Sequence, residues 1–214
     1  MYTAIFIAIC ILVPILFLAG TKGLVKLVSI YLCWNIAVGL LSYSGFFTDT
    51  QSLPPRMALV VVPAVIFVLT CIRHRGNVQI KLGYHLALHS LRLPIELILY
   101  GIYLKGLIPQ LMTYKGWNWD ITSGTSAIIL LLVSVSGRPI PKKFFRYWNL
   151  ACLLLLAIVV TIAILSAPSP IQLIARENPN VAVLQFPYTL LPSLIVPLVC
   201  LSHLIMLKGI DMGK

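Results

Sequence analysis

The sequence predicts an all-α integral membrane protein, a bundle of seven transmembrane helices, and three observations support this fold class. Hydrophobic residues fill 60% of the 214 positions and charged residues only 10%, whereas about 25% is usual in a soluble domain. Mean hydropathy is +1.00. Apolar stretches long enough to cross a hydrocarbon layer of roughly 30 Å recur along the whole chain. We therefore expect one polytopic domain over residues 1–214, without a soluble module.

The lengths of the apolar stretches set the expected spans. The third and fifth stretches are short, so five spans are the minimum and seven the preferred number. The expected spans are residues 3–20, 23–44, 56–72, 82–105, 121–137, 146–167 and 183–207.

The first three spans carry few polar side chains. The first contains Pro14 and has no basic region before it, so we do not expect a cleaved signal peptide. The second has Asn35 near its middle. The third has Pro63 and is followed by a basic turn at residues 73–77.

The last three spans differ in their helix-start and helix-breaking signals. Span five opens with ITSGTSA, small residues that permit close helix approach, and Asp120 stands at its N-cap position. Span six is rich in leucine. Span seven contains Pro187, Pro192 and Pro197. Because each proline removes a backbone donor, we expect this helix to be bent or partly broken.

The charges of the connecting segments predict the orientation. With seven spans, eleven Lys and Arg residues fall on one side of the membrane and four on the other. Basic residues concentrate on the cytoplasmic side, so we expect the N-terminus outside and the C-terminus inside. The net charge of +11 is then explained by basic residues that flank the spans and contact anionic lipid head groups, so it gives no reason to expect a nucleic-acid partner. We expect a multi-pass protein of a cell membrane, the inner membrane of a bacterium.

Span four carries ionisable side chains where the middle of the membrane should lie. Spacings of four, three and four residues place its two histidines, arginine and glutamate within about 40–60° of one another around a helix. Two tyrosines continue the same face. This polar face of span four consists of His85, His89, Arg92, Glu96, Tyr100 and Tyr103. A charge at the bilayer centre costs about 2.5–3.5 kcal/mol on insertion scales, so such residues mark a functional site.

Within this face, Arg92 and Glu96 are expected to neutralise each other. No other Lys or Arg, and no other acid, lies well inside an expected span. Pro94 lies between them and leaves the carbonyl of Ser90 without its helical donor. An unwound carbonyl beside charged side chains is typical of the pockets that transporters form at the membrane midplane.

Span seven offers a second polar face. In a regular helix this face would consist of Gln185, Thr189, Ser193, Cys200 and His203. The orientation places His203 at a depth similar to that of His85 and His89. We expect spans four and seven to pack together and to enclose a polar cavity, with Asn35 as a further contributor.

Three functions fit these residues. The leading hypothesis is a cavity that binds or transports a small solute or ion, with protons coupled through Glu96 and the histidines and with Arg92 anchoring an anionic group. The second is a redox or enzymatic module that holds haem or a transition metal through His85, His89 and His203. The third is a non-catalytic subunit or scaffold in which the Arg92–Glu96 pair is structural.

The sequence leaves the chemistry open. It contains no HExxH, GxSxG or phosphate-binding glycine motif, so whether the chain is an enzyme is undecided. Its five cysteines are scattered without a CxxC, which indicates apolar filling and not a disulfide or zinc framework. The solute or cofactor is equally open, as is assembly into a homo- or hetero-oligomer.

Overall fold

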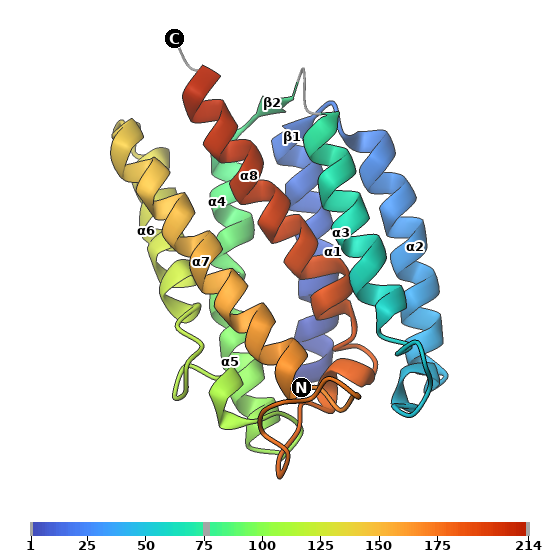
Figure 1. Cartoon of the computed structure of the whole chain (residues 1–214). Helices are drawn as coiled ribbons and strands as arrows, with labels where there is room; N and C mark the ends of the chain where they lie inside the picture. Colours follow the sequence, from blue (N-terminus) through green and yellow to red (C-terminus); the bar gives the residue numbers. More distant parts are fainter. Residues whose placement is uncertain (1, 75–77, 213–214) are drawn as a thin grey trace.

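The computed structural model is helical apart from one short two-stranded ribbon in the part of the chain it describes, residues 2–74 and 78–212 (Figure 1). The helices are α1 (Tyr2–Gly20), α2 (Val25–Tyr43), α3 (Ala58–Arg73), α4 (Leu82–Ser90), α5 (Arg92–Tyr103), α6 (Ile121–Val135), α7 (Lys142–Ser166) and α8 (Val196–Met212). The connections contain the 3-10 turns η1 (Phe46–Thr48), η2 (Gln110–Met112) and η3 (Ala182–Leu184). A π-helical turn, η4 (Leu191–Ile195), leads into α8.

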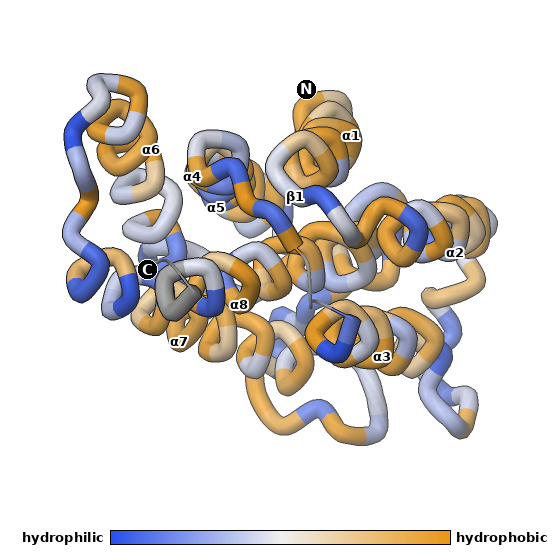
Figure 2. Tube along the Cα trace, turned by 90° about the horizontal axis from the view of Figure 1, so that it is seen from above, coloured by the Kyte–Doolittle hydropathy of each residue, from blue (hydrophilic) through white to orange (hydrophobic). Residues whose placement is uncertain are grey.

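The helices run side by side, and the two chain ends lie at opposite ends of the bundle (Figure 1). The view down the bundle places α8 between a row that contains α1 and α4 and a group that contains α3 and α7 (Figure 2). Packing contacts agree, because α8 touches α1, α3, α4 and α7. In Leu191–Gly209, 61% of the apolar stretch is buried, against at most 33% in the other long helices. The segment η4–α8 is therefore the central rod of the bundle.

Four helices within the described residues are long and apolar enough to cross a membrane: α1, α2, α7 and the segment Leu191–Gly209. The helices α3 and α6 are apolar but shorter. Large apolar side chains point outward from several helices, among them Ile36, Leu132 and Leu154, each more than 60% exposed. Such a surface is unfavourable in water and favourable in lipid.

Five expected spans match helices whose ends differ by a few residues, namely α1, α2, α3, α6 and α7. Span four is instead divided into α4 and α5 by a turn at Leu91. The break lies where Pro94 cannot donate to the carbonyl of Ser90. The backbone N–H of Leu91 donates to Leu88 at 3.2 Å, a tighter turn than that of an α-helix.

The expected start of span seven at residue 183 is wrong. The continuous helical rod begins at Leu191, and the preceding residues form η3 and a series of turns. Pro187 and Pro192 remove backbone donors along this segment, and the π-helical turn at η4 confirms that the helix is irregular there.

The two-stranded ribbon fixes the end of α1 against α4. It pairs β1 (Thr21–Lys22) with β2 (Gln79–Ile80) in antiparallel register. A Cβ at Gly20 would lie 2.9 Å from the Cβ of Tyr84 and 3.0 Å from the ring of His85, so this close approach requires glycine. Residues 75–77 of the expected basic turn at 73–77 lie outside the described residues. Lys214, which the orientation argument also uses, lies outside them too.

Candidate functional site

Spans four and seven are in direct contact through buried polar side chains. The rings of His89 and His203 stack with centroids 3.9 Å apart. The hydroxyl of Ser202, on α8, lies 2.8 Å from His85 Nδ1 and 2.9 Å from His89 Nε2. All three imidazoles are fully buried. The rings of His89 and His203 are thus in direct contact, and Ser202 lies between His85 and His89.

The counter-ion of Arg92 is Asp120, not Glu96. Arg92 donates from Nε to Asp120 Oδ2 at 2.6 Å and from Nη2 to Oδ1, so the pair is bidentate. The expected Arg92–Glu96 salt bridge is therefore wrong. Arg92 is the first residue of α5, so its side chain can reach the segment before α6. Arginine before glutamate is also the less favourable order for an i,i+4 pair.

Asp120 occupies the N-cap position of α6, as expected, but its carboxylate makes no capping hydrogen bond. Both of its oxygens face Arg92 instead. Arg92 and Asp120 are 3% and 5% exposed. The pair is thus a buried, charge-assisted contact between α5 and the start of α6.

Glu96 is held by an asparagine. Its Oε2 accepts a hydrogen bond from Asn118 Nδ2 at 2.7 Å, and the same amide also donates to the Met112 carbonyl at 3.0 Å. The Asn118 Oδ1 accepts from the backbone N–H of Asp120 at 3.1 Å. Within the described chain, Glu96 forms no salt bridge. Asn118, in the loop between α5 and α6, therefore positions both acids, and it is a residue that the sequence did not single out.

The hydrogen-bond partners favour one tautomer of His85 and of His89. His85 Nε2 lies 3.2 Å from the carbonyl of Gly20, which can only accept, and 3.1 Å from the hydroxyl of Thr21, which can accept as well, so both partners are compatible with a hydrogen on Nε2. The other nitrogen of a neutral His85 then accepts the hydroxyl hydrogen of Ser202, and Ser202 accepts from His89 Nε2. His89 Nδ1 is left as a buried acceptor with no partner among the described residues. The donors of this short chain all point toward the β1–β2 end of the bundle.

His203 is fixed in the same way. The amide nitrogen of Asn149 donates to the Phe145 carbonyl at 2.8 Å, so its Oδ1 faces His203 Nδ1, also at 2.8 Å. His203 Nδ1 therefore carries the hydrogen, and Nε2 accepts from Arg92 Nη1 at 3.1 Å. With these partners His85 and His203 are satisfied in their neutral form, whereas His89 keeps its Nδ1 without a partner among the described residues.

The geometry does not support the haem or metal hypothesis. Across residues 2–74 and 78–212, no three His, Cys, Asp or Glu side chains are grouped so that they could hold a metal ion. Both nitrogens of His85 and of His203 already have protein partners. A haem ligated from both spans would lie between its two axial rings, but His89 and His203 stack directly on each other.

The remaining candidate residues lie elsewhere. Thr189, just before η4, bonds Ser42 at 2.7 Å, and the carbonyl of Ser193 in η4 accepts from Tyr31, so both residues hold this segment against α2. Asn35 donates to the Tyr31 carbonyl within α2 at 2.9 Å.

Gln185 is exposed. Tyr100 and Tyr103 lie near each other at the end of α5, where Lys115 donates to the Tyr100 hydroxyl at 2.7 Å. We expected these residues to line one polar cavity together with the histidines, and the structure shows that they do not. The irregular backbone of η4 turns this side of span seven toward α2 instead.

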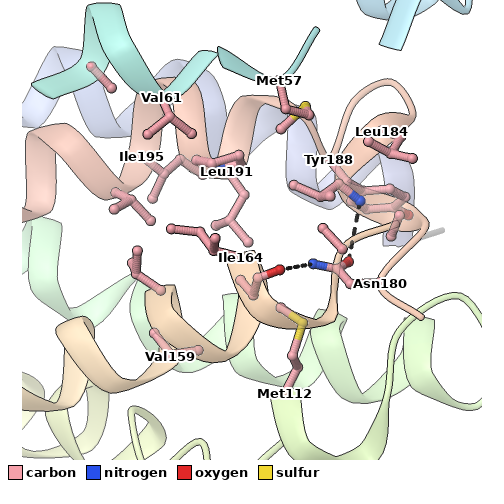
Figure 3. Close-up of a pocket in the computed structure, with 18 of the residues that line it drawn as sticks. Met57, Val61, Met112, Val159, Ile164, Asn180, Leu184, Tyr188, Leu191 and Ile195 are labelled. Atoms are coloured by element: carbon pink, nitrogen blue, oxygen red, sulfur yellow. Dashed lines mark hydrogen bonds between the residues drawn. The ribbon is translucent and has the colours of Figure 1, made fainter. Parts of the chain in front are cut away.

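A cavity of about 540 Å³ lies between α3, α7 and η4–α8, and α5 contributes part of its wall. Figure 3 shows Val61 entering from α3, Val159 and Ile164 from α7, and Leu191 and Ile195 from η4. Most other lining residues are also aliphatic. The cavity thus differs from the expected one in place and in polarity, and it includes Arg92 and Glu96 but none of the histidines.

The charged residues in the cavity wall pair off except for one. They are Asp49, Arg56, Arg92, Glu96 and Asp120. Arg56 Nη2 lies 2.5 Å from Asp49 Oδ2 in a partly exposed salt bridge, and Arg92 pairs with Asp120. Glu96 is the remaining acid, and it is only 2% exposed.

Removal of the Ser202 hydroxyl should destabilise the protein. Ser202→Ala leaves His85 Nδ1 and His89 Nε2 buried without partners, and a buried unsatisfied group costs about 1–3 kcal/mol. We expect a clear fall in the thermal unfolding temperature of the detergent-purified protein. Ser90→Ala is the matched control, because within the described residues the Ser90 hydroxyl bonds only the Ala87 carbonyl of its own helix. Equal effects of the two substitutions would contradict the assigned network.

Comparison with known protein families matches residues 53–210 to a family described as a domain of unknown function (DUF8737). No curated protein and no solved structure matches the chain.

Proposed function

Because the chain belongs to the DUF8737 family, a domain of unknown function, we propose its activity from its own residues: it binds an amphiphilic molecule drawn from the lipid bilayer. In this proposal it crosses a bacterial cell membrane seven times, through α1, α2, α3, α4–α5, α6, α7 and η4–α8. The four long apolar helices and the outward-facing aliphatic side chains support a membrane location. The excess of basic residues in the segments at the β1–β2 end supports an inside position for that end.

The observation that carries the proposal is the cavity between α3 and α7. Its volume of about 540 Å³ falls within the range of about 300–1,000 Å³ that is typical of small-molecule sites. Its wall is mainly aliphatic, so it favours an apolar chain over a hydrated solute. Val61 and Ile164 line it and are also each 37% exposed, which supports an opening toward the acyl chains of the bilayer.

The polar part of the ligand would lie toward Glu96, since the other charges of the wall are paired. Arg92 is neutralised by Asp120, so we do not assign it the role of anchor for an anion. The scaffold hypothesis assigns Arg92 to a structural ion pair. We propose that the Arg92–Asp120 pair has this structural role within a protein that binds a ligand.

We also propose a proton route toward the β1–β2 end, because a chain of hydrogen bonds leads in that direction. With these tautomers the N–H and O–H donors of His89, Ser202 and His85 are aligned in one direction and end at the Gly20 carbonyl and the Thr21 hydroxyl. A proton taken up at His89 Nδ1 would then be matched by one passed from His85 Nε2 to the Thr21 hydroxyl, since a backbone carbonyl does not take up a proton. We propose this segment as the inner half of any proton coupling.

Photolabelling tests the binding proposal. The probe is a long-chain fatty alcohol with a diazirine group, incorporated in lipid vesicles with the purified protein, and hexadecanol is the competitor. We expect labelling of cavity residues to be saturable and to be lost on addition of hexadecanol. Val61→Trp and Ile164→Trp fill the cavity and should reduce this saturable labelling several-fold.

The matched control is Ile36→Trp, because Ile36 is an exposed residue of α2 that does not line the cavity. It should leave the saturable labelling unchanged. The proposal is wrong if hexadecanol reduces the labelling of α3, α7 and η4 no more than it reduces the labelling of the outer face of α2.

A further inference from the structure

The charge arrangement of the cavity indicates the class of its ligand. Of its charged residues, the two arginines and the two aspartates form salt bridges, and Glu96 alone lacks an ionic partner among the described residues. Among the described residues its hydrogen-bond donor is the neutral amide of Asn118. The site is therefore built with one more negative than positive charge when Glu96 is ionised.

A buried carboxylate in an aliphatic wall has to be neutralised. Desolvation of an isolated charge is so unfavourable that such a group takes up a proton or pairs with a cation. The proton and the cation exclude each other, because one carboxylate oxygen is already occupied by Asn118 and a second positive charge would be unbalanced. Asp120 is not an alternative partner, since both its oxygens face Arg92.

We propose that the ligand is a lipophilic cation, an amine or quaternary ammonium group with apolar substituents, which exchanges with the proton of Glu96. This inference rests on the proposed function and names the ligand class of the same cavity. In the exchange, the cation pairs with the carboxylate, one proton leaves the carboxyl group, and no covalent or redox step is involved.

The lining of the cavity suits such a cation. Tyr188 and Phe47 contribute aromatic rings to its wall, and aromatic faces attract cations that have lost their water. Apolar substituents would occupy the aliphatic part between α3 and α7. A neutral lipid chain would fill the same part but would leave Glu96 protonated.

Few other titratable groups face Glu96. Arg92 lies one turn away on the same helix and is hydrogen-bonded to His203 of α8. Asp120 precedes α6, and α6 itself carries no titratable side chain. Helix α1, which packs against α5, carries Tyr2 and Cys10, and α4, which also packs against α5, carries Tyr84, His85 and His89. On α5 itself, Tyr100 and Tyr103 follow Glu96. Tyr188 and Cys200 complete the titratable groups of the cavity wall. Glu96 is thus the group whose charge decides between proton and cation.

Binding of tetraphenylphosphonium tests the inference. The detergent-purified full chain is titrated with this cation by calorimetry between pH 5 and pH 9, and proton release is measured in weak buffer. We expect the dissociation constant to fall by about tenfold per pH unit while Glu96 is protonated, and one proton to be released per cation bound. Tetraphenylborate, an anion of similar shape, should bind much more weakly.

Glu96→Gln keeps the acceptor for Asn118 but cannot pair with a cation. It should lower the affinity for tetraphenylphosphonium at least tenfold and remove both the pH dependence and the proton release. Glu177→Gln is the matched control, because Glu177 is exposed in the segment between α7 and η3. It should behave as the unchanged protein.

The inference is overturned if tetraphenylborate binds as tightly as the cation, if no proton is released, or if Glu96→Gln retains the pH dependence. Proton release by the unchanged protein and by Glu96→Asp decides the matter if Glu96→Gln does not fold. Saturable labelling by the fatty alcohol together with no cation binding would reject the cation and leave the proposed function intact. Loss of both would reject both.

Discussion

Asp120→Asn should be among the most destabilising single substitutions in this protein, with an expected loss of about 3–5 kcal/mol in the free energy of unfolding. The substitution leaves the guanidinium of Arg92 charged, with only 3% of the residue exposed and a neutral imidazole and amide as partners. The attraction that offset the desolvation of both groups is lost, while the desolvation of Arg92 remains.

The measurement is thermal or denaturant unfolding of the purified protein, with Asp49→Asn as the matched control. Asp49 also forms a salt bridge with an arginine, but the two side chains are 42% and 31% exposed, so its loss should cost about 0–1 kcal/mol. In the double variant Arg92→Met/Asp120→Leu no buried charge remains unpaired, and most of the stability should return. If Asp120→Asn and Asp49→Asn are equally mild, the pair does not hold α5 to α6 as we describe.

Apolar length and proline positions were sufficient to predict most of the helices. Stretches such as residues 3–20 and 23–44 became α1 and α2 because an apolar run of that length satisfies its backbone only as a helix. Pro94 and the prolines of span seven correctly indicated irregular backbone. The exact ends of the spans were less predictable. The start of η4, for example, depends on the turns before it, and these turns have no periodic pattern of apolar residues.

Side-chain partners were not predictable from helical spacing. The spacing places His85, His89, Arg92 and Glu96 on adjoining turns, but it favoured the wrong counter-ion for Arg92. The true partner, Asp120, lies 28 residues beyond Arg92 and reaches it only because α6 packs on α5. Contacts of this kind depend on tertiary packing and leave no local pattern.

The cavity could not be predicted for a different reason. Its lining residues, such as Val61 and Ile164, are aliphatic and resemble those that fill a core or face lipid. Apolar composition does not distinguish a filled space from an empty one. Only the paired and unpaired charges in its wall give it a recognisable chemistry.

Gly124→Ala should also be strongly destabilising, by about 3 kcal/mol, the upper part of the usual range for overpacking. A Cβ at Gly124 would lie 2.4 Å from the backbone nitrogen of Leu93 and 3.0 Å from its Cα. Backbone atoms cannot rotate away as the end of a side chain can, so α6 and α5 would have to separate. This is the close approach that the small residues of ITSGTSA predict.

Gly83→Ala is the control, because a Cβ at that position in α4 meets nothing within 4 Å. It should be neutral or stabilising by up to about 1 kcal/mol, since alanine restricts the unfolded chain more than glycine does. Unfolding temperatures of the two variants give the comparison, and a Gly124→Ala protein as stable as Gly83→Ala would contradict the packing of α6 on α5. Gly124 lies one turn after Asp120, and Leu93 follows Arg92 directly. The separation that destabilises Gly124→Ala therefore also pulls Asp120 from Arg92, so the glycine sets the distance across which the buried ion pair can form.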